Sequence, residues 1–314
     1  MLTNVFWILL GLAVAYGGAE AFIRGSVSVA RRLRVPPVIV GLTIIAWGTS
    51  APELFVSLDA ALNANHGVSV GNVIGSNIFN VGIILGLAAL LCPLTVHLQL
   101  IRVDIPILVG ITVLLLAVFH DGQLGRAEGA LLLLCFLLYT AATFYFSRRS
   151  APRDVVEEFT EAQPRPLGSL LVECLLIAGG LAALIFGADR LVDGAVALGR
   201  DLGVSETVIG LTVVAAGTSL PELVTSVVAA ARKEPDVAVG NIVGSNIFNV
   251  SCILGVSSTI TPLTGGQIEL VDLIALVVSS VILVPMAWTG FVLQRWEGVV
   301  LLVAYGGYSV LLWS

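Results

Sequence analysis

The sequence predicts an all-α integral membrane protein in which ten transmembrane helices form two inverted five-helix repeats, with broken helices at the membrane midplane. Three observations lead to this fold class. The composition is too apolar for a water-soluble domain, ten apolar segments are long enough to cross a bilayer, and the two halves of the chain are duplicates of each other.

The composition identifies lipid as the solvent. Hydrophobic residues make up 57% of the 314 residues, and charged residues only 11%, whereas soluble domains carry roughly 25% charged residues. A soluble fold of this size has no place to bury so much apolar surface. The net charge of -6 indicates no partner, and no nucleic-acid partner is expected.

Ten apolar segments have about the 20 residues that a membrane-spanning helix needs. They lie near residues 3–23, 36–62, 68–93, 103–119, 127–147, 169–188, 206–231, 237–261, 270–289 and 296–313. The first and the sixth are expected to continue as amphipathic helices to about 33 and 202. Residues 148–168 are polar and contain prolines, which indicates a cytoplasmic connecting loop between a first repeat (1–147) and a second repeat (169–314).

The duplication is clearest in two stretches of 40 residues. Gly41–Asn80 and Gly210–Asn249 are identical at 23 of 40 positions, with a constant separation of 169 residues. Equivalent residues are therefore five spans apart. Because five is an odd number, the two copies cross the membrane in opposite directions, and a pseudo-two-fold axis in the membrane plane relates them.

The basic residues predict the orientation of the bundle, since cytoplasmic loops are enriched in Lys and Arg. With the N-terminus outside, twelve of the fifteen basic residues fall inside and three fall outside. We therefore expect a multi-pass protein of the inner or plasma membrane with both termini on the extracellular or periplasmic side.

Each copy carries a carboxylate in the middle of an apolar span. The first copy reads Gly48-Thr-Ser-Ala-Pro-Glu53 and the second reads Gly217-Thr-Ser-Leu-Pro-Glu222. A charge at this depth costs about 2.5–3.5 kcal/mol on insertion scales and indicates a functional site. The proline predicts a break in the helix, which leaves carbonyl oxygens near Ala46 and Ala215 available. The spacing Ser50-x-x-Glu53 is that of a capping box, so a half-helix is expected to begin at Ser50 and another at Ser219.

A second motif follows in each copy. Gly71-Asn-Val-Ile-Gly-Ser-Asn-Ile-Phe-Asn80 recurs with conservative changes as Gly240–Asn249. Ser76 and Asn80 are four residues apart and share one helix face, as do Ser245 and Asn249. The remaining asparagines of the motif, Asn72, Asn77, Asn241 and Asn246, are alternatively explained as hydrogen-bonding residues that hold helices together.

Where these four segments converge, the sequence predicts a metal site made of oxygen ligands. It would contain the two glutamates, the hydroxyls, the amides and the two carbonyls at Glu53, Glu222, Thr49, Ser50, Ser76, Asn80, Thr218, Ser219, Ser245, Asn249, Ala46 and Ala215. Oxygen ligands in this number suit Ca²⁺, Na⁺ or Mn²⁺ and disfavour zinc and copper. No cofactor is expected, and the sequence makes no prediction of the oligomeric state.

The two motif pairs resemble the α-1 and α-2 repeats of the cation/Ca²⁺ exchanger superfamily, and most closely the prokaryotic sodium/calcium exchangers. The resemblance implies exchange of Na⁺ for Ca²⁺ by alternating access, in which the first and sixth helices slide over the other eight. It implies that Glu53 and Glu222 are shared by Ca²⁺ and Na⁺ and that the hydroxyl and carbonyl ligands serve flanking sodium sites. Some archaeal members carry Asp where this chain has Asn249, which removes one potential charge or proton site here.

Three alternatives remain open from the residues. A proton/calcium antiporter would load the same glutamates with protons, a cation channel could conduct through the same oxygen ring, and an intramembrane enzyme could use paired carboxylates for acid–base chemistry. No protease or zinc motif supports the enzyme, so we expect a transporter whose partners are Ca²⁺, Na⁺ and the lipid bilayer.

Overall fold

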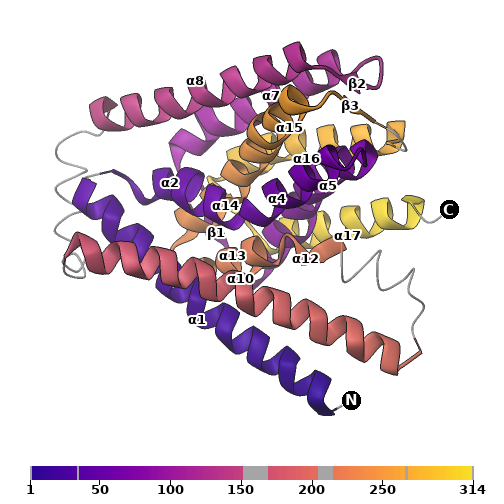
Figure 1. Cartoon of the computed structure of the whole chain (residues 1–314). Helices are drawn as coiled ribbons and strands as arrows, with labels where there is room; N and C mark the ends of the chain where they lie inside the picture. The colour runs from indigo at the N-terminus through magenta and orange to yellow at the C-terminus, as the bar shows by residue number, and fades with distance from the viewer. Residues whose placement is uncertain (1, 34, 151–168, 204–214, 266–267, 313–314) are drawn as a thin grey trace.

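The computed structural model describes residues 2–33, 35–150, 169–203, 215–265 and 268–312 (Figure 1). Its first half consists of helices, three short π-helical turns (labelled η) and two short strands. These elements are α1 (Leu2–Leu33), α2 (Pro37–Val40), η1 (Gly41–Ile45), α3 (Ala46–Thr49), α4 (Ala51–Leu62), α5 (His66–Phe79), η2 (Asn80–Leu85), α6 (Gly86–Leu91), β1 (Leu94–Thr95), η3 (Leu100–Asp104), α7 (Ile105–Val118), β2 (Gln123–Leu124) and α8 (Arg126–Ser150).

The second half repeats this order. Its elements are α10 (Leu170–Asp201), α12 (Ala215–Gly217), α13 (Leu220–Ala231), α14 (Pro235–Ile247), η5 (Phe248–Ile253), α15 (Leu254–Ile260), β3 (Leu263–Thr264), α16 (Leu270–Trp288), β4 (Val292–Leu293) and α17 (Arg295–Leu312). The all-α membrane fold class is thereby confirmed.

The described helices fall on the predicted spans. Seven are long and apolar enough to cross a membrane, and the bent segment Pro37–Leu62 makes an eighth. Helix α17 and the pair α12 and α13 occupy the remaining two predicted segments, although residues 206–214 of the latter lie outside the described residues. Helices α1 and α10 continue to Leu33 and Asp201 as expected. Helix α8 reaches Ser150, so residues 148–150 of the predicted loop are helical, and residues 151–168 lie outside the described residues.

The bundle has a central layer and a peripheral pair of helices. In the segment Pro235–Ile260, 94% of the most apolar window is buried, whereas the corresponding values are 33% for α1 and 22% for α10. Figure 1 shows α1 and α10 packed side by side along one side of the bundle. The segment with α14, η5 and α15 is therefore the centre of the molecule, and α1 and α10 are its flank.

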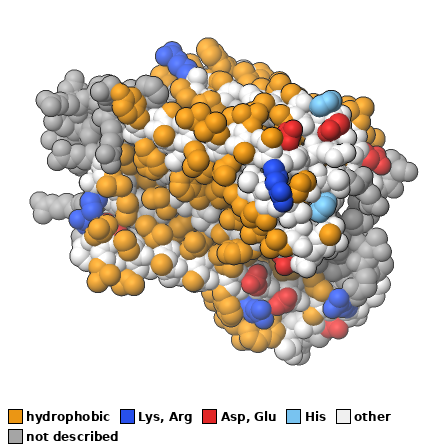
Figure 2. All heavy atoms as spheres, turned by 45° about the horizontal axis from the view of Figure 1, so that its top comes forward, with side chains coloured by type: hydrophobic (Ala, Val, Ile, Leu, Met, Phe, Trp, Pro, Cys, Tyr) orange, Lys and Arg blue, Asp and Glu red, His pale blue; other side chains and the backbone are white. Residues whose placement is uncertain are grey.

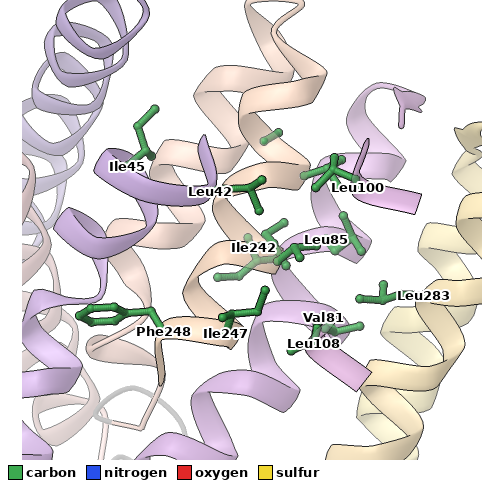
Figure 3. Packing of buried hydrophobic residues seen from close by; sticks show 14 of the residues in the cluster. Leu42, Ile45, Val81, Leu85, Leu100, Leu108, Ile242, Ile247, Phe248 and Leu283 are labelled. Carbon is green, nitrogen blue, oxygen red and sulfur yellow. The ribbon is translucent and has the colours of Figure 1, made fainter. Parts of the chain in front are cut away.

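Apolar packing fills the centre around α14. Ile242 of α14 is completely buried, and it lies among Leu42 of η1 and Leu85 of η2 (Figure 3). Gly244 permits the approach of η1, because a Cβ atom there would lie 2.6 Å from the carbonyl oxygen of Leu42. Hydrophobic side chains also cover much of the outer surface (Figure 2); among them, Leu134 and Leu138 of α8 are exposed, as expected for side chains that face lipid.

The inverted repeat is visible in the strand pairing. Strand β1 of the first half pairs with β4 of the second, and β2 pairs with β3, both antiparallel. The registers are equivalent, since Leu94 lies opposite Leu293 and Leu263 lies opposite Leu124. Each strand thus joins a partner from the other repeat, and the two short sheets tie the halves together.

Candidate functional site

Both glutamates of the repeated motif are in the first turn of a half-helix. The chain bends by 46° between the helical segment that ends at Thr49 and α4, and Pro52 stands at the start of α4. Because proline donates no backbone hydrogen bond and clashes with the preceding turn, the helix cannot continue through this point. The predicted break is therefore present in the first copy, and it places Glu53 at a positive helix end.

The same local sequence has the same effect in the second copy. Pro221 is the second residue of α13, and Glu222 lies in the first turn of that helix. The side chains of Glu53 and Glu222 are both completely buried. Burial of a carboxylate is costly unless hydrogen bonds or counter-ions compensate it, so the partners of each group determine what the site can do.

The capping-box hypothesis for Ser50 and Ser219 is wrong. Neither serine caps its own helix with its side chain. Instead, the Ser50 hydroxyl donates to Glu222 Oε1 at 2.8 Å, and the Ser219 hydroxyl donates to Glu53 Oε1 at 2.9 Å. A capping serine accepts a hydrogen bond from a backbone N–H and usually has an extended backbone. Ser50 (φ -82°, ψ 7°) and Ser219 (φ -89°, ψ 7°) do not have that backbone conformation, and each hydroxyl donates to the glutamate of the other repeat.

This exchange of hydrogen bonds brings the two copies of the motif face to face. Each serine lies within one helical turn of the glutamate of its own repeat, so the two crossed hydrogen bonds place the carboxylates of Glu53 and Glu222 near each other. In the part of the chain that the structure describes, the side-chain donors to these two carboxylates are hydroxyl groups, and no Arg or Lys pairs with either. Two like charges buried together without cationic side chains require a bound cation or protons for charge balance.

An amide cluster lies beside the glutamates. Asn77 Nδ2 donates to the backbone carbonyl of Asn246, and Asn246 Nδ2 donates to the backbone carbonyl of Asn77, each at 3.2 Å. Asn80 Nδ2 donates to Asn246 Oδ1 at 2.9 Å, and Asn249 Nδ2 donates to Asn77 Oδ1 at 3.0 Å. The two halves of the cluster have equivalent hydrogen bonds, so the pseudo-two-fold axis passes between Asn77 and Asn246.

Four buried oxygens that can only accept hydrogen bonds have no partner among the described residues. They are Glu53 Oε2, Glu222 Oε2, Asn80 Oδ1 and Asn249 Oδ1. Turn η2, which begins at Asn80, packs against α13, and η5, which contains Asn249, packs against α4. Each amide is thus carried next to the half-helix that holds the glutamate of the other repeat. Buried acceptors without donors are the arrangement that a desolvated cation stabilises.

The hydroxyls that were predicted as ligands are buried to different degrees. Thr49 and Ser245 are completely buried, Ser76 is nearly so, and Thr218 is half-buried. Ser245 Oγ donates to the carbonyl oxygen of Ala46 at 3.3 Å, which joins these two predicted ligands across the repeats.

The prediction of an unpaired carbonyl at Ala46 is wrong. This oxygen accepts the helical hydrogen bond of the Ser50 N–H at 3.0 Å in addition to the one from Ser245. The reason is that Pro52, the residue that lacks an N–H, stands six positions after Ala46, so the helical bond at Ala46 is intact. Ala215 begins α12.

The remaining asparagines of the second motif form hydrogen bonds between helices, as the helix-packing interpretation predicts. Asn72 Nδ2 donates to Ser57 Oγ, and Asn241 Nδ2 donates to Ser226 Oγ, both at 2.9 Å. Asn77 and Asn246, which the sequence left as packing residues, bond directly to the predicted ligands Asn249 and Asn80. The signal that could have identified them is their three-residue spacing from Asn80 and Asn249, which places both on the same helix face.

The two repeats differ in how far their equivalent residues are buried. Thr49 and Asn241 are completely buried, whereas their equivalents Thr218 and Asn72 are half-buried. Asn241 lies between the site and the start of α14, and Asn72 lies between the site and the start of α5. The site is therefore more tightly covered toward the membrane face where α14 begins than toward the face where α5 begins.

Comparisons with known proteins match this architecture over the whole chain. The family model described as "Sodium/calcium exchanger protein" matches residues 3–145 and 172–314. The sodium/calcium exchanger MaX1 of Methanosarcina acetivorans is 32% identical, with 98% of each chain covered. The inner membrane protein YrbG of Escherichia coli is 35% identical, with 92% of this chain and 90% of the relative covered.

A solved structure agrees with the fold. The sodium-calcium exchanger NCX_Mj, soaked with Na⁺ and Ca²⁺, superposes with a TM-score of 0.84 and 32% identity over 100% of this chain and 99% of the other. That structure describes extracellular ion exchange and induced binding-site occlusion in NCX_Mj. The family model, MaX1 and NCX_Mj are all named as exchangers, so the chain is a membrane transporter and not an enzyme. With two family matches that together span almost its full length, the chain belongs to the sodium/calcium exchanger protein family.

Proposed function

We propose that this chain is a secondary active antiporter that exchanges Na⁺ for Ca²⁺ by alternating access. The observation that carries the proposal is the pair of buried carboxylates, Glu53 and Glu222, with one acceptor oxygen on each that has no partner among the described residues. Two formal negative charges match one Ca²⁺ ion. They can equally be compensated by two or more Na⁺ ions that share the hydroxyl, amide and carbonyl oxygens around them.

Competition between Ca²⁺ and Na⁺ for the same two carboxylates favours coupled exchange of the ions over uncoupled leak of either ion. An empty site would have to carry two negative charges through a dry barrier, which is strongly unfavourable. A site filled with either ion is close to neutral, so only loaded forms cross. Ca²⁺ and Na⁺ are hard cations that prefer oxygen ligands. The ligands proposed for them are Glu53, Glu222, Thr49, Ser50, Ser76, Asn80, Thr218, Ser219, Ser245, Asn249, Ala46 and Ala215.

The unequal burial of equivalent residues supports alternating access. In a protein made of inverted repeats, the opposite conformation arises when the two repeats exchange their arrangements. Here Thr218 and Asn72 are half-buried while Thr49 and Asn241 are completely buried. The exchange would cover the first pair and uncover the second, which opens the site to the other side of the membrane.

The proposed topology places both termini on the extracellular or periplasmic side. It places residues 148–168 in the cytoplasm between the repeats 1–147 and 169–314. Single cysteines at positions 4 and 312, introduced after the four native cysteines are replaced, test this. We expect an impermeant maleimide to label both from outside intact cells; labelling only after permeabilisation would reverse the topology.

Purified protein in liposomes tests the function. We expect an outward Na⁺ gradient at clamped pH to drive uptake of ⁴⁵Ca²⁺, and the variants Glu53→Gln and Glu222→Gln to lose it. Glu128→Gln is the matched control, because Glu128 lies in the first turn of α8, away from the site. Uptake that follows a proton gradient and ignores Na⁺ would establish proton/calcium exchange instead. Ca²⁺ flux that requires no counter-ion would establish a channel.

A further inference from the structure

We infer that Asn77 and Asn246 are positioning residues that keep the side-chain oxygens of Asn80 and Asn249 turned toward the cation. The inference rests on the proposed function, since it concerns how that site is kept ready for its ion. It starts from the amide cluster on the pseudo-two-fold axis, whose members are Asn77, Asn80, Asn246 and Asn249.

The orientation of Asn246 follows from its contact with a backbone group. A backbone carbonyl can only accept a hydrogen bond. Because the Asn246 side chain lies 3.2 Å from the carbonyl oxygen of Asn77, it must present Nδ2 there. Its Oδ1 then points to the other side, where it accepts from Asn80 at 2.9 Å.

This contact determines the orientation of Asn80 in turn. Since Oδ1 of Asn246 can only accept, Asn80 must offer Nδ2 to it, and Oδ1 of Asn80 is left on the opposite side of its amide group. That oxygen is buried and has no donor among the described residues. The same sequence of steps runs from the Asn246 carbonyl through Asn77 to Asn249, whose Oδ1 is also buried without a donor.

The alternative orientation would compete with the ion. If Asn80 were free to rotate, its NH₂ group could turn toward the carboxylates, because hydrogen bonds to an ionised acceptor are roughly twice as strong as neutral ones. The amide would then neutralise part of the site and present hydrogens to an incoming cation. An acceptor at Asn246 Oδ1 gives the NH₂ group a partner away from the site and prevents this.

The cluster also holds helices together, since it links α5 to α14 and η5. A residue that only joins helices would lower stability when it is replaced, whatever the chemistry at position 80. Replacing a positioning residue should weaken Ca²⁺ binding only if the side chain at position 80 can turn a non-ligating group toward the ion. Asparagine can turn its NH₂ group toward the ion, whereas an aspartate carboxylate presents an oxygen in either orientation.

This difference defines the experiment, which is a double-mutant cycle read by ⁴⁵Ca²⁺ equilibrium dialysis of the detergent-solubilised full chain without Na⁺. Asn246→Leu removes both side-chain hydrogen bonds while the number and branching of the side-chain heavy atoms stay the same. We expect it to raise the Kd for Ca²⁺ about tenfold or more when position 80 is Asn. In the Asn80→Asp background we expect the same substitution to change the Kd by less than about twofold, or to tighten binding. Within each background the Asn246→Leu substitution leaves the net charge of the site unchanged.

The equivalent cycle with Asn77→Leu and Asn249→Asp tests the other half and is expected to behave alike. If Asn246→Leu prevents folding, Asn246→Ala is used instead, because it removes the same hydrogen bonds with a smaller side chain. Thr112→Val is the control for loss of a buried hydrogen bond between helices outside the cluster, because Thr112 of α7 lies 3.1 Å from the Ser280 hydroxyl of α16, and we expect it to leave the Kd unchanged.

Equal losses in the parent and in the Asn80→Asp background, or no loss in either, would overturn the positioning role while the transport function stands. Absence of Ca²⁺ binding by the unaltered chain would instead overturn the proposed function, and the inference with it. Tight binding by the unaltered chain, combined with a loss that disappears in the Asn80→Asp background, would establish the role.

Discussion

Glu173, in the first turn of α10, is completely buried and bonds to Arg32, near the end of α1. Arg32 donates from Nε to Glu173 Oε2 at 2.7 Å and from Nη2 to Oε1 at 3.0 Å. The pseudo-two-fold axis relates this contact to a weaker one at the opposite ends of the same helices, where Asn4 donates to Asp201 at 2.8 Å. One end of the α1 and α10 pair is thus closed by a buried ion pair, and the other by an exposed amide.

Arg32→Gln is therefore expected to destabilise the protein by about 1–3 kcal/mol, because it leaves a buried carboxylate without its charged donor. Glu173→Gln should cost less, since the Arg32 side chain is 35% exposed and can turn to water. Asp201→Asn is the matched control at the equivalent position, with an effect below about 0.5 kcal/mol. Thermal unfolding in detergent measures the melting temperatures of the three variants. Equal decreases for Arg32→Gln and Asp201→Asn would contradict the prediction.

Adjacent glycines of α1 are expected to respond in opposite ways to alanine. A Cβ atom at Gly18 would lie 2.8 Å from the carbonyl oxygen of Gly180 in α10, whereas one at Gly17 would meet nothing within 4 Å. Gly18→Ala should therefore separate α1 from α10 and lower the melting temperature. Gly17→Ala should leave it unchanged or stabilise the helix by up to about 1 kcal/mol. A destabilised Gly17→Ala variant would indicate that Gly17 has a contact of its own.

Much of the fold and the site could be predicted from the sequence because the duplication is strong where function is concentrated. The motif pairs identified the broken helices, both glutamates and the converging asparagines. The partners of the serine hydroxyls could not be predicted, because Ser50 donates to Glu222, which is remote in the chain, and the local sequence shows only the capping-box spacing to Glu53.

A local shift in the repeat also escaped the sequence comparison. Tyr139 donates to Asp104 at 2.9 Å, and its equivalent Tyr308 donates to Asp272 at 2.8 Å. The tyrosines are 169 residues apart, but the aspartates are 168 apart. The π-helical turn η3 at Leu100–Asp104 absorbs the extra residue, as π-helical turns do within α-helices. An alignment at constant spacing pairs Asp104 with Leu273 and hides this equivalence.

Cysteine reactivity is expected to differ between equivalent positions of the two repeats. In a chain with its four native cysteines replaced, Asn72→Cys should react with a small aqueous thiol reagent at least about tenfold faster than Asn241→Cys. The reason is that Asn72 is half-buried and Asn241 is completely buried. Denatured samples of both variants control for the intrinsic reactivity of each thiol. Similar rates in the folded protein would show that both sides of the site are equally accessible.

The ion pair between Glu20 of α1 and Arg232, which follows α13, is expected to favour the conformation described above. Arg232 Nη1 donates to Glu20 Oε1 at 2.7 Å, and Arg24 also pairs with Glu20. The equivalent positions in the other half are Asp189 and Asn63. Because Asn63 carries no charge, an ion pair cannot form there when the repeats exchange arrangements. The opposite conformation therefore lacks this interaction.

Loss of the pair should then shift the population toward the opposite conformation. Both side chains are partly exposed, so the expected effect is about 0.2–1 kcal/mol. This corresponds to a rise of up to about fivefold in the labelling rate of Asn241→Cys when Arg232→Gln is added. Glu20→Gln should give a similar rise, and the double variant no more than either single one, because both substitutions remove the same interaction. High salt should raise the rate in the parent and leave the variants unchanged; additive effects of the two substitutions would mean that they act on the conformation separately.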